Sequence, residues 1–411
     1  MGNNRRERET GSRPEWATLE DWVRGQVRGF IQRALEDEVT EFLGRRKSER
    51  RSGVDAAGGY RNGHGKPRRL TLSCGTITVQ RPRLRDLEDR FESRVLPLFK
   101  RKSQAVSDLL PELYLHGLAQ GDFELALRGL LGDGAPLSSR TVARLKEKWQ
   151  AELEEWQTRR LDDTDIVYMW VDGIYVKAGL EKEKAALLVV LGALADGRKV
   201  VLAVVPGHRE STRSWSEVLR GLKRRGLRGP RLVIGDGHLG IWGALRNVYP
   251  ETAEQRCWNH KMLNVLDKLP KTQQAAAKAL LCQIPYSPSR AEAARRRDQF
   301  ISWCAPRDHS RAARCLLDDW ERLVAFYDFP KPHWQHLRTT NPVESPFAAA
   351  RLRTDAAKRF KKVANATVVI WKMLLVAEKA FRTVKHPELM KGVRNEVRYV
   401  DGIEVKTKAA A

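Results

Sequence analysis

Two aspartates, each beside a glycine at the edge of an apolar run, have the setting in this chain that most strongly indicates chemistry. Asp172 lies within 166–176, a run rich in β-branched and aromatic residues, and Asp236 follows the short run 231–234. An ionised carboxylate in an apolar sheet is costly unless an opposite charge pairs with it. A divalent cation would explain both carboxylates together, whereas an ordinary acid in a strand-end turn would explain each of them singly.

A third acid, Glu344, lies in a segment that predicts the start of a helix. Asn341 fits the N-cap and Pro342 the first helical position, which makes Glu344 the acid of a capping box. Glu344 equally fits a metal ligand beside phosphate, because Arg351 lies seven residues on, two turns along the same helix face. Further cations follow Arg351 closely: Arg353, Lys358, Arg359, Lys361 and Lys362. Both interpretations of Glu344 stay open at this point.

Three carboxylates without histidine or cysteine suit a hard cation, so we expect Mg²⁺ or Mn²⁺. Two such ions, about 3.5–4 Å apart, stabilise the attacking and leaving oxygens of an in-line displacement at phosphorus. We expect Asp172 to bridge the two ions, with Asp236 and Glu344 on one ion each.

The elements that must position these acids follow one another from residue 165. The segment 165–205 predicts three strands joined by short turns, one of them at Asp196-Gly197. After them we expect a helix over 211–225, a strand over 232–235, a helix over 238–248 and a strand over 254–258. This is the order of a ribonuclease H-like mixed sheet, an α/β fold in which the first and fourth strands are neighbours. Asp172 and Asp236 would then lie together.

The predicted organisation places this core after mainly helical DNA-binding and dimerisation regions. Its parts are an N-terminal helix and basic linker (1–59), a small β module with a helical, helix-turn-helix-like DNA-binding region (60–160), the first part of the five-stranded core (161–260), a helical insertion (261–337), the final core helices (338–384) and a loose basic tail (385–411). In the first part, the apolar stripe from Leu19 to Leu43 fits either self-association or packing within its own domain.

Charge narrows the class of partner. The chain has 411 residues with 75 Lys and Arg against 51 Asp and Glu, a formal net charge of +24. Nucleic acid is therefore the first partner to expect and an anionic membrane the second. No apolar run approaches the roughly 18 residues of a membrane span, no secretory signal is recognisable, and the five cysteines are scattered. We expect a cytoplasmic, DNA-associated protein with reduced thiols and no membrane contact.

Four short motifs, in this order and at these separations, resemble the Mutator-type transposases of bacterial insertion sequences. They are Asp172-Gly-Ile-Tyr-Val-Lys177, Gly235-Asp236-Gly237, Gln255-Arg-Cys-Trp-Asn-His260-Lys261 and Arg338-Thr-Thr-Asn-Pro-Val-Glu344-Ser345. With upstream motifs the resemblance covers roughly residues 15 to 385. That family is similar to retroviral integrases, and the resemblance implies a ribonuclease H-like core with an Asp-Asp-Glu triad formed by Asp172, Asp236 and Glu344.

Cys257 and His260 match the family's C(2)H signature. A zinc site requires about four ligands, and the other thiols are too scattered to complete a recognisable one. A structural role is the favoured interpretation, and zinc stays open. Trp242 and Trp258 fit either base stacking or core packing.

The resemblance implies a transposase that binds the terminal inverted repeats of a mobile element, cleaves 3′ ends and transfers strands into target DNA. Synapsis of two ends calls for a homodimer or larger assembly. A metal-dependent nuclease or resolvase, or a catalytically idle DNA-binding derivative, are the alternatives. The candidate DNA contacts are Arg140, Arg144, Lys177, Arg256, Lys261, Arg338, Arg351, Arg353 and Lys358.

Overall fold

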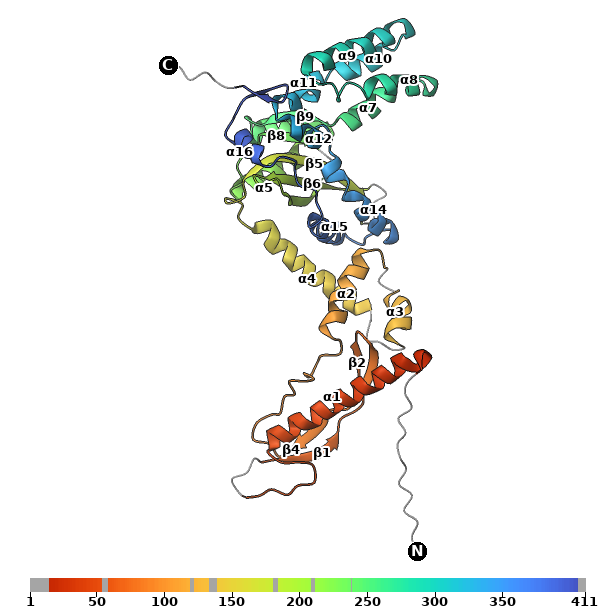
Figure 1. Cartoon of the computed structure of the whole chain (residues 1–411), viewed down its shortest axis with the longest axis vertical. Coiled ribbons are helices and arrows are strands. Elements are labelled where there is room, and N and C mark those ends of the chain that lie inside the picture. Colours follow the sequence, from red (N-terminus) through yellow and green to blue (C-terminus); the bar gives the residue numbers. More distant parts are fainter. Residues whose placement is uncertain are drawn as a thin grey trace, which may run out of the picture. The chain divides into compact units, whose positions relative to one another are not determined.

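The computed structural model describes residues 15–53, 58–118, 122–132, 139–179, 184–207, 211–237 and 239–405 (Figure 1). The chain divides into two compact units, unit 1 up to Leu145 and unit 2 from Lys146. Within the described ranges no helix has the length and apolar character needed to cross a bilayer.

Unit 1 is built around a long helix and two pairs of strands. Helix α1 (Leu19–Leu43) packs against the hairpin of β2 (Arg68–Leu72) and β3 (Gly75–Val79). The second pair is β1 (Tyr60–His64) with β4 (Pro82–Arg85). The pairing of Leu72 with Gly75 closes this hairpin around a turn at Ser73-Cys74.

The apolar stripe of α1 serves the core of unit 1. Leu35 is buried together with Leu70, Ile77 and Val79, because these strand residues alternate toward the helix. Packing within its own domain is therefore confirmed for this part of the stripe. Phe30 of the same helix is 67% exposed, so the stripe is covered on one side only.

Three helices follow the strands, as the sequence predicts. They are α2 (Gln104–Leu115), α3 (Phe123–Leu131) and α4 (Ser139–Thr158). The hydroxyl of Ser103 caps α2 by accepting a hydrogen bond from the amide of Val106 at 3.3 Å. The predicted cap of α4 at Ser138 lies outside the described residues.

Unit 2 contains a five-stranded mixed sheet in the order β7-β6-β5-β8-β9. The strands are β5 (Ile166–Val176), β6 (Ala185–Leu194), β7 (Lys199–Gly207), β8 (Leu232–Gly235) and β9 (Ala253–Arg256). The first three are antiparallel, and β8 runs parallel to both β5 and β9. The first and fourth strands are thus neighbours, as predicted from the order of elements.

The two faces of β5 have different coverings. Met169 and Val171 share a core with Trp215 of α5 (Thr212–Arg224) and Trp242 of α6 (Leu239–Val248). On the alternate positions, the Trp170 indole donates to the carbonyl of His336 at 3.0 Å, and Tyr168 is hydrogen-bonded to His333 at 2.7 Å. Side chains alternate along a strand, so Asp172 belongs to this second face.

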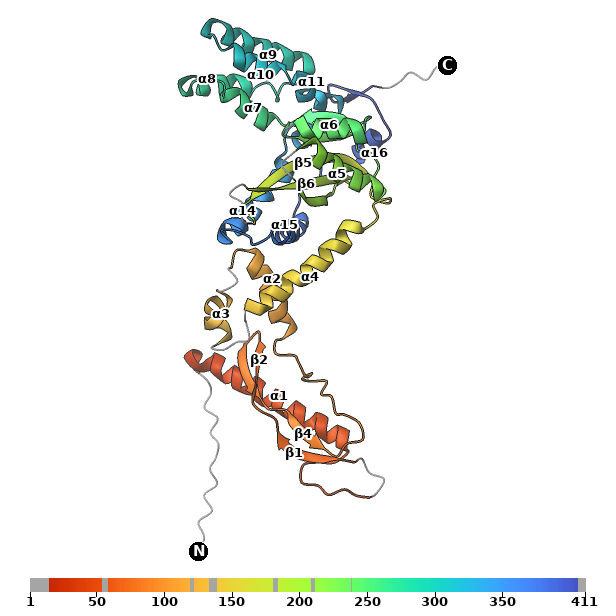
Figure 2. The same ribbon diagram turned by 180° about the vertical axis from the view of Figure 1, so that it is seen from behind.

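The helical insertion lies beside the edge strand β9, at one end of unit 2 in both views (Figures 1 and 2). Its helices are α7 (Trp258–Leu266), α8 (Lys271–Leu281), α9 (Arg290–Cys304), α10 (Ser310–Leu317), α11 (Trp320–Leu323) and α12 (Trp334–Leu337).

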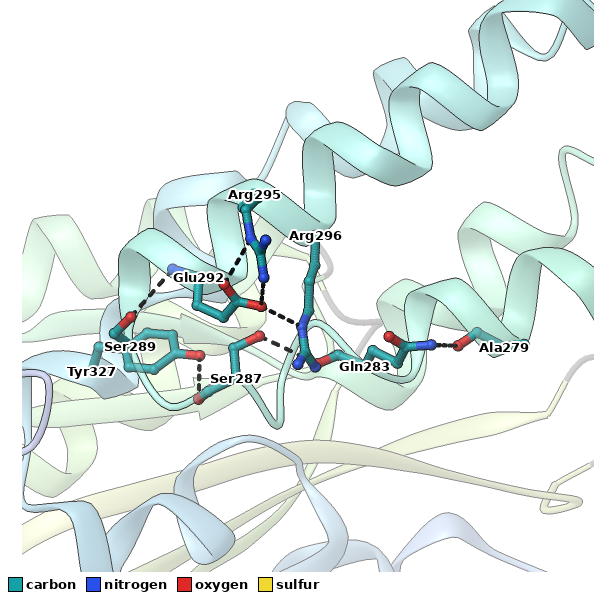
Figure 3. A network of polar contacts seen from close by, with 8 residues as sticks. All are labelled: Ala279, Gln283, Ser287, Ser289, Glu292, Arg295, Arg296 and Tyr327. Carbon is teal, nitrogen blue, oxygen red and sulfur yellow. Dashed lines mark hydrogen bonds and ion pairs between the residues drawn. The ribbon is translucent and has the colours of Figure 1, made fainter.

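A polar network joins these helices to one another (Figure 3). Arg296 of α9 donates to the carboxylate of Glu292 at 2.9 Å and to the carbonyl of Gln283 at 2.8 Å. The hydroxyl of Tyr327 donates to the carbonyl of Ser287 at 3.0 Å. The guanidinium of Arg296 and the phenol of Tyr327 thus both bond to backbone carbonyls of the loop before α9. These hydrogen bonds fix the position of that loop relative to the helices of the insertion.

The third acid lies on a helix that is shorter than predicted. Helix α13 (Asn341–Glu344) ends before Pro346, and α14 (Phe347–Ala356) begins after it. Proline lacks the N–H needed for the next intrahelical hydrogen bond, so the predicted continuous face from Glu344 to Arg351 is interrupted. The N-cap is Thr340 rather than the predicted Asn341, and its side chain makes no capping hydrogen bond. The capping-box interpretation of Glu344 was therefore wrong.

The C-terminal segment is more ordered than predicted. Helix α15 (Val363–Glu378) packs on β7 and ends well before residue 384. Up to residue 405, the expected loose tail instead forms α16 (Glu388–Arg394) and the small hairpin β10 (Tyr399–Val400) and β11 (Ile403–Glu404), and residues 406–411 lie outside the described residues. Met390 is fully buried, and Arg231 donates to the carbonyl of Arg394 at 2.8 Å. An apolar anchor and a backbone hydrogen bond thus attach this segment to the sheet.

Candidate active site

The sheet brings Asp172 and Asp236 to neighbouring positions. Val171 of β5 pairs with Gly235 of β8 in parallel register, and each aspartate is the next residue of its own chain segment. Asp172 is only 8% exposed, and one of its carboxylate oxygens accepts a hydrogen bond from the amide of Gly173 at 2.8 Å. Two carboxylates therefore leave adjacent strands at the same level of the sheet.

Gly237 fixes the turn that follows Asp236. Its φ of +94° favours glycine, and a Cβ there would lie 1.7 Å from the guanidinium of Arg256. That guanidinium donates to the Gly237 carbonyl at 2.8 Å. Position 237 thus requires glycine for two independent reasons: its backbone conformation and the close approach of the buried Arg256 guanidinium.

A buried ion network lies directly behind this turn. Asp319 of the insertion accepts from Lys261 at 2.6 Å and pairs with Arg256 at 3.3 Å. Burial by itself would raise the pKa of Asp319, but the hydrogen bond from Lys261 and the charges of Arg256, Lys261 and Arg322 together lower it below the ordinary value. The network attaches the insertion to the end of β9.

Arg256 and Lys261 were predicted as DNA contacts, and the structure gives them a different role. They are 7% and 3% exposed, and both point to the same carboxylate. A buried cation requires such a partner, which leaves neither side chain available at the surface. We therefore remove both residues from the candidate DNA surface.

Thr340 positions Glu344 and also links the motif that contains Glu344 to the C(2)H pair. The Thr340 hydroxyl donates to the carboxylate of Glu344. The sulfur of Cys257 accepts from the amide of Thr340 at 3.3 Å and lies 3.2 Å from the Thr340 hydroxyl oxygen. Cys257 is fully buried, so its contact with Thr340 anchors the start of α13 to the end of β9.

Two further hydrogen bonds hold the same two motifs together. The amide of Trp258 donates to the carbonyl of Arg338 at 2.9 Å, and the side chain of Asn259 donates to that of Asn341 at 3.0 Å. The amide of Cys257 in turn donates to the carbonyl of Gly235 at 2.8 Å, and α13 packs against β5 and β6. All three acids therefore lie on elements that are bonded or packed to one another.

His260 interacts electrostatically with both Glu344 and Asp236. Its Nδ1 is 3.8 Å from a carboxylate oxygen of Glu344. Interaction with Cys257, opposed by burial and aided by the charges of Glu344 and Asp236, raises the pKa of His260 to about 9. The raised pKa favours the imidazolium form of His260 beside the Glu344 carboxylate.

The ligand atoms of Cys257, His260 and Glu344 all lie within 4.8 Å of one another, and this is the one such group of three among the described residues. Asp172 and Asp236 are not part of it. The ligand atoms of the three predicted acids, Asp172, Asp236 and Glu344, therefore do not all lie within 4.8 Å of one another. Because the Thr340 amide donates to the Cys257 sulfur and the Thr340 hydroxyl oxygen lies 3.2 Å from it, the structural role of Cys257 is the one that the contacts support.

The remaining predicted DNA contacts divide by exposure. Lys177, Arg351 and Lys358 are exposed in unit 2, and Arg144 is exposed in unit 1. Arg353 is only 3% exposed, so its burial does not fit a surface contact. The side chain of Arg140 lies outside the described residues.

Arg338 is engaged with aromatic rings rather than with solvent. Its guanidinium lies 4.8, 5.2 and 5.7 Å from the ring centroids of Tyr286, Phe326 and Trp334. Burial lowers the pKa of Arg338 from its ordinary value. We therefore assign it to packing of the insertion. Trp242 and Trp258, each 1% exposed, likewise belong to the core.

Two residues with clear structural roles at the site, Thr340 and Asp319, were not found from the sequence. Thr340 precedes Asn341 and Pro342, and asparagine is the more common N-cap residue, so the pattern favoured Asn341. Asp319 lies far along the chain from Arg256 and Lys261, and no spacing rule connects them.

Comparison with known proteins places the chain in a family. The model of the Mutator family of transposases matches residues 5–382. A transposase for insertion sequence element IS6120 of Mycolicibacterium smegmatis is 45% identical over 289 residues, which cover 70% of this chain and 89% of that protein.

More distant relatives have the same description. The transposase for element IST2 of Acidithiobacillus ferrooxidans is 40% identical over 280 residues, or 68% of this chain and 94% of that protein. The transposase for element IS406 of Burkholderia multivorans is 32% identical over 353 residues, or 84% of this chain and 88% of that protein. The chain therefore belongs to the Mutator family of transposases.

Proposed function

We propose that this protein is the transposase of an insertion sequence, and that it cleaves and joins DNA at the terminal inverted repeats of its element. The observation that carries the proposal is the adjacent placement of Asp172 and Asp236 on neighbouring parallel strands, with Glu344 on α13, which packs against β5 and β6. Membership of the Mutator family supports the same conclusion.

We further propose that the catalytic core is ribonuclease H-like. Three antiparallel strands followed by two parallel ones, with β5 next to β8, support this assignment. The insertion enters after β9 and returns the chain at α13, so the third acid comes back to the sheet from a separate segment.

The three carboxylates fit a site for hard divalent cations. Asp172 is a nearly buried acid in an otherwise apolar strand, a setting that favours a cation partner. Asp172, Asp236 and Glu344 would hold the two Mg²⁺ or Mn²⁺ ions. When bound, these ions supply activation of the attacking hydroxyl and stabilisation of the leaving oxygen.

The protein's own groups would orient this site and hold the DNA. Thr340 sets the direction of the Glu344 carboxylate, and the His260 imidazolium balances the charge of the neighbouring acids. Lys177 and Lys358 are exposed on segments joined by the bridge between Ala178 and Phe360, which brings two cations together for phosphate contact.

The test uses the purified full-length chain, Mg²⁺ and a labelled terminal inverted repeat. Strand-transfer products support the proposal. Cleavage without joining would indicate a nuclease or resolvase, and a mobility shift without cleavage would indicate a catalytically idle DNA-binding protein. Asp172→Ala, Asp236→Ala and Glu344→Ala should each abolish cleavage and leave end binding nearly intact. Retained cleavage in any one would remove that residue from the triad.

We also propose a homodimer or larger assembly for synapsis, with the exposed side of α1 as its interface. Leu35 of α1 belongs to the core of unit 1, so deletion of the helix would disrupt folding. Phe30→Glu is the sharper test because Phe30 is 67% exposed, and Leu125→Glu on α3, 69% exposed, is its matched control. Light scattering should show a smaller assembly for the first variant only. An unchanged mass would exclude Phe30 from the interface.

A further inference from the structure

Unit 1 contains a cleft of about 790 Å³ that the candidate active site does not use. It is lined by the connection between β1 and β2, by β2 and β4, and by the loop that leads to α2. Seven of its fourteen lining residues are lysine or arginine, and none is aspartate or glutamate. These cations are Lys66, Arg68, Arg69, Arg81, Arg83, Arg90 and Arg101.

Most of these cations have no partner of their own. Within the part of unit 1 that the structure describes, the side chains of Lys66, Arg81, Arg83, Arg90 and Arg101 make no hydrogen bond and no ion pair. Elsewhere in the chain arginines are commonly paired, as Arg295 and Arg296 are with Glu292. Like charges facing one cleft without acids repel one another, so the arrangement favours an anionic occupant.

The crowding of cations in the cleft affects the pKa of one of them, Arg68. Burial first, and then the charges of Arg81 and Arg101, lower the pKa of Arg68 from its ordinary value. An anion in the cleft would reverse the contribution of the two neighbouring charges.

The backbone that carries the cations is fixed in position. Arg68 donates to the carbonyl of Pro97 at 3.2 Å and to that of Lys100, which joins the loop to β2. The carbonyl of Arg101 accepts from the amide of Thr71 at 2.9 Å. The cleft is therefore present before any ligand binds, and little ordering entropy is lost on binding.

We propose that this cleft binds the sugar–phosphate backbone of duplex DNA. This assignment rests on the proposed function and deepens it by naming a DNA-holding surface in unit 1. Several exposed cations, spread over three segments of the chain, suit a repeating polyanion. A site for one small anion would instead concentrate backbone amides on a single point. Contacts to phosphate position the duplex and carry no sequence information.

The experiment measures binding of the full-length chain to two labelled duplexes, a terminal inverted repeat and a scrambled sequence, over a range of salt concentrations. The test variant combines Arg83→Gln, Arg90→Gln and Arg101→Gln, which removes three exposed cations that stabilise nothing within the fold. The matched control combines Arg220→Gln, Arg224→Gln and Arg311→Gln, three exposed arginines of unit 2. Both variants lower the net charge equally, and circular dichroism checks that both fold.

For the cleft variant we expect affinity to fall about 10²-fold at about 0.1 M salt, and the slope of log K against log salt to fall by about 2–3. The loss should be alike for both duplexes, and the control should change little. Unchanged affinity in the cleft variant, or an equal loss in the control, overturns the proposal. A wild-type chain that binds neither duplex overturns the proposed function as well, which distinguishes the two failures.

Discussion

Replacing Asp319 by asparagine tests how the insertion is attached to the catalytic sheet. The substitution keeps the shape of the side chain and removes its charge. Lys261 and Arg256, whose side chains are only 4% and 8% exposed, would then lose their shared carboxylate. Arg322 would lose less, because Glu254 pairs with it at 2.5 Å. Removing one partner of a buried ion pair costs about 3–5 kcal/mol, and we expect a loss of stability in this range.

Denaturant unfolding of the full-length chain measures this loss of stability. Tryptophan fluorescence is the signal to follow, because it reports on unit 2, which contains the ion network. Every tryptophan except Trp16 and Trp22 lies in unit 2, so the signal reports mainly on that unit. Glu321→Gln is the matched control. Glu321 pairs with Arg290 at the surface and its side chain is 78% exposed, so its loss should cost less than about 1 kcal/mol.

The pH dependence gives a second check with a definite sign. The folded-state pKa of Asp319 is lowered from 3.8, so its contribution to stability is present above that value and is lost as pH falls through the folded pKa. The difference between wild type and Asp319→Asn should therefore be full at neutral pH and shrink below about pH 4. A difference under about 1 kcal/mol at neutral pH, or one that persists unchanged in acid, would refute the assignment of this network as an attachment point.

Two other substitutions test the surroundings of the acids. Gly237→Ala should destabilise unit 2 by about 1–2 kcal/mol through backbone strain alone and displace Arg256, whereas Gly221→Ala on α5, where a Cβ meets nothing within 4 Å, should stabilise it slightly; denaturant midpoints compare them, and equal shifts would contradict the steric cause. Thr340→Val should lower cleavage about 10–100-fold, as loss of a group that orients a metal ligand does, while Thr339→Val should not; single-turnover cleavage at matched DNA occupancy measures both, and full activity of Thr340→Val would show that Glu344 needs no such support.

The sequence predicted the parts of the fold that depend on local pattern. The long apolar strands of 165–205 and the turn at Asp196-Gly197 appear where expected. The proximity of Asp172 and Asp236 followed from the order of elements, because few arrangements of such strands are possible. Strand adjacency was thus available without coordinates.

What the sequence could not supply was long-range pairing. The burial of Arg256 and Lys261 depends on Asp319, which lies about sixty residues away along the chain. Cation content alone favoured a surface role for both residues. The segment after residue 385 was likewise judged by its charge, although Met390 and Val393 anchor it in the fold. Helix α13 begins at Asn341, one residue earlier than predicted, with Thr340 as its N-cap residue.

The helical insertion separates β9 from α13 in the sequence, and this determines the order in which the residues of the site are synthesised. During synthesis all five strands of the sheet have been made by Arg256, together with Asp172 and Asp236. Glu344 and its supporting Thr340 are made only after the insertion. A nascent chain at this stage has every strand of the sheet but only two of the three acids, and under the proposed chemistry it cannot cut DNA until the chain beyond the insertion has been made.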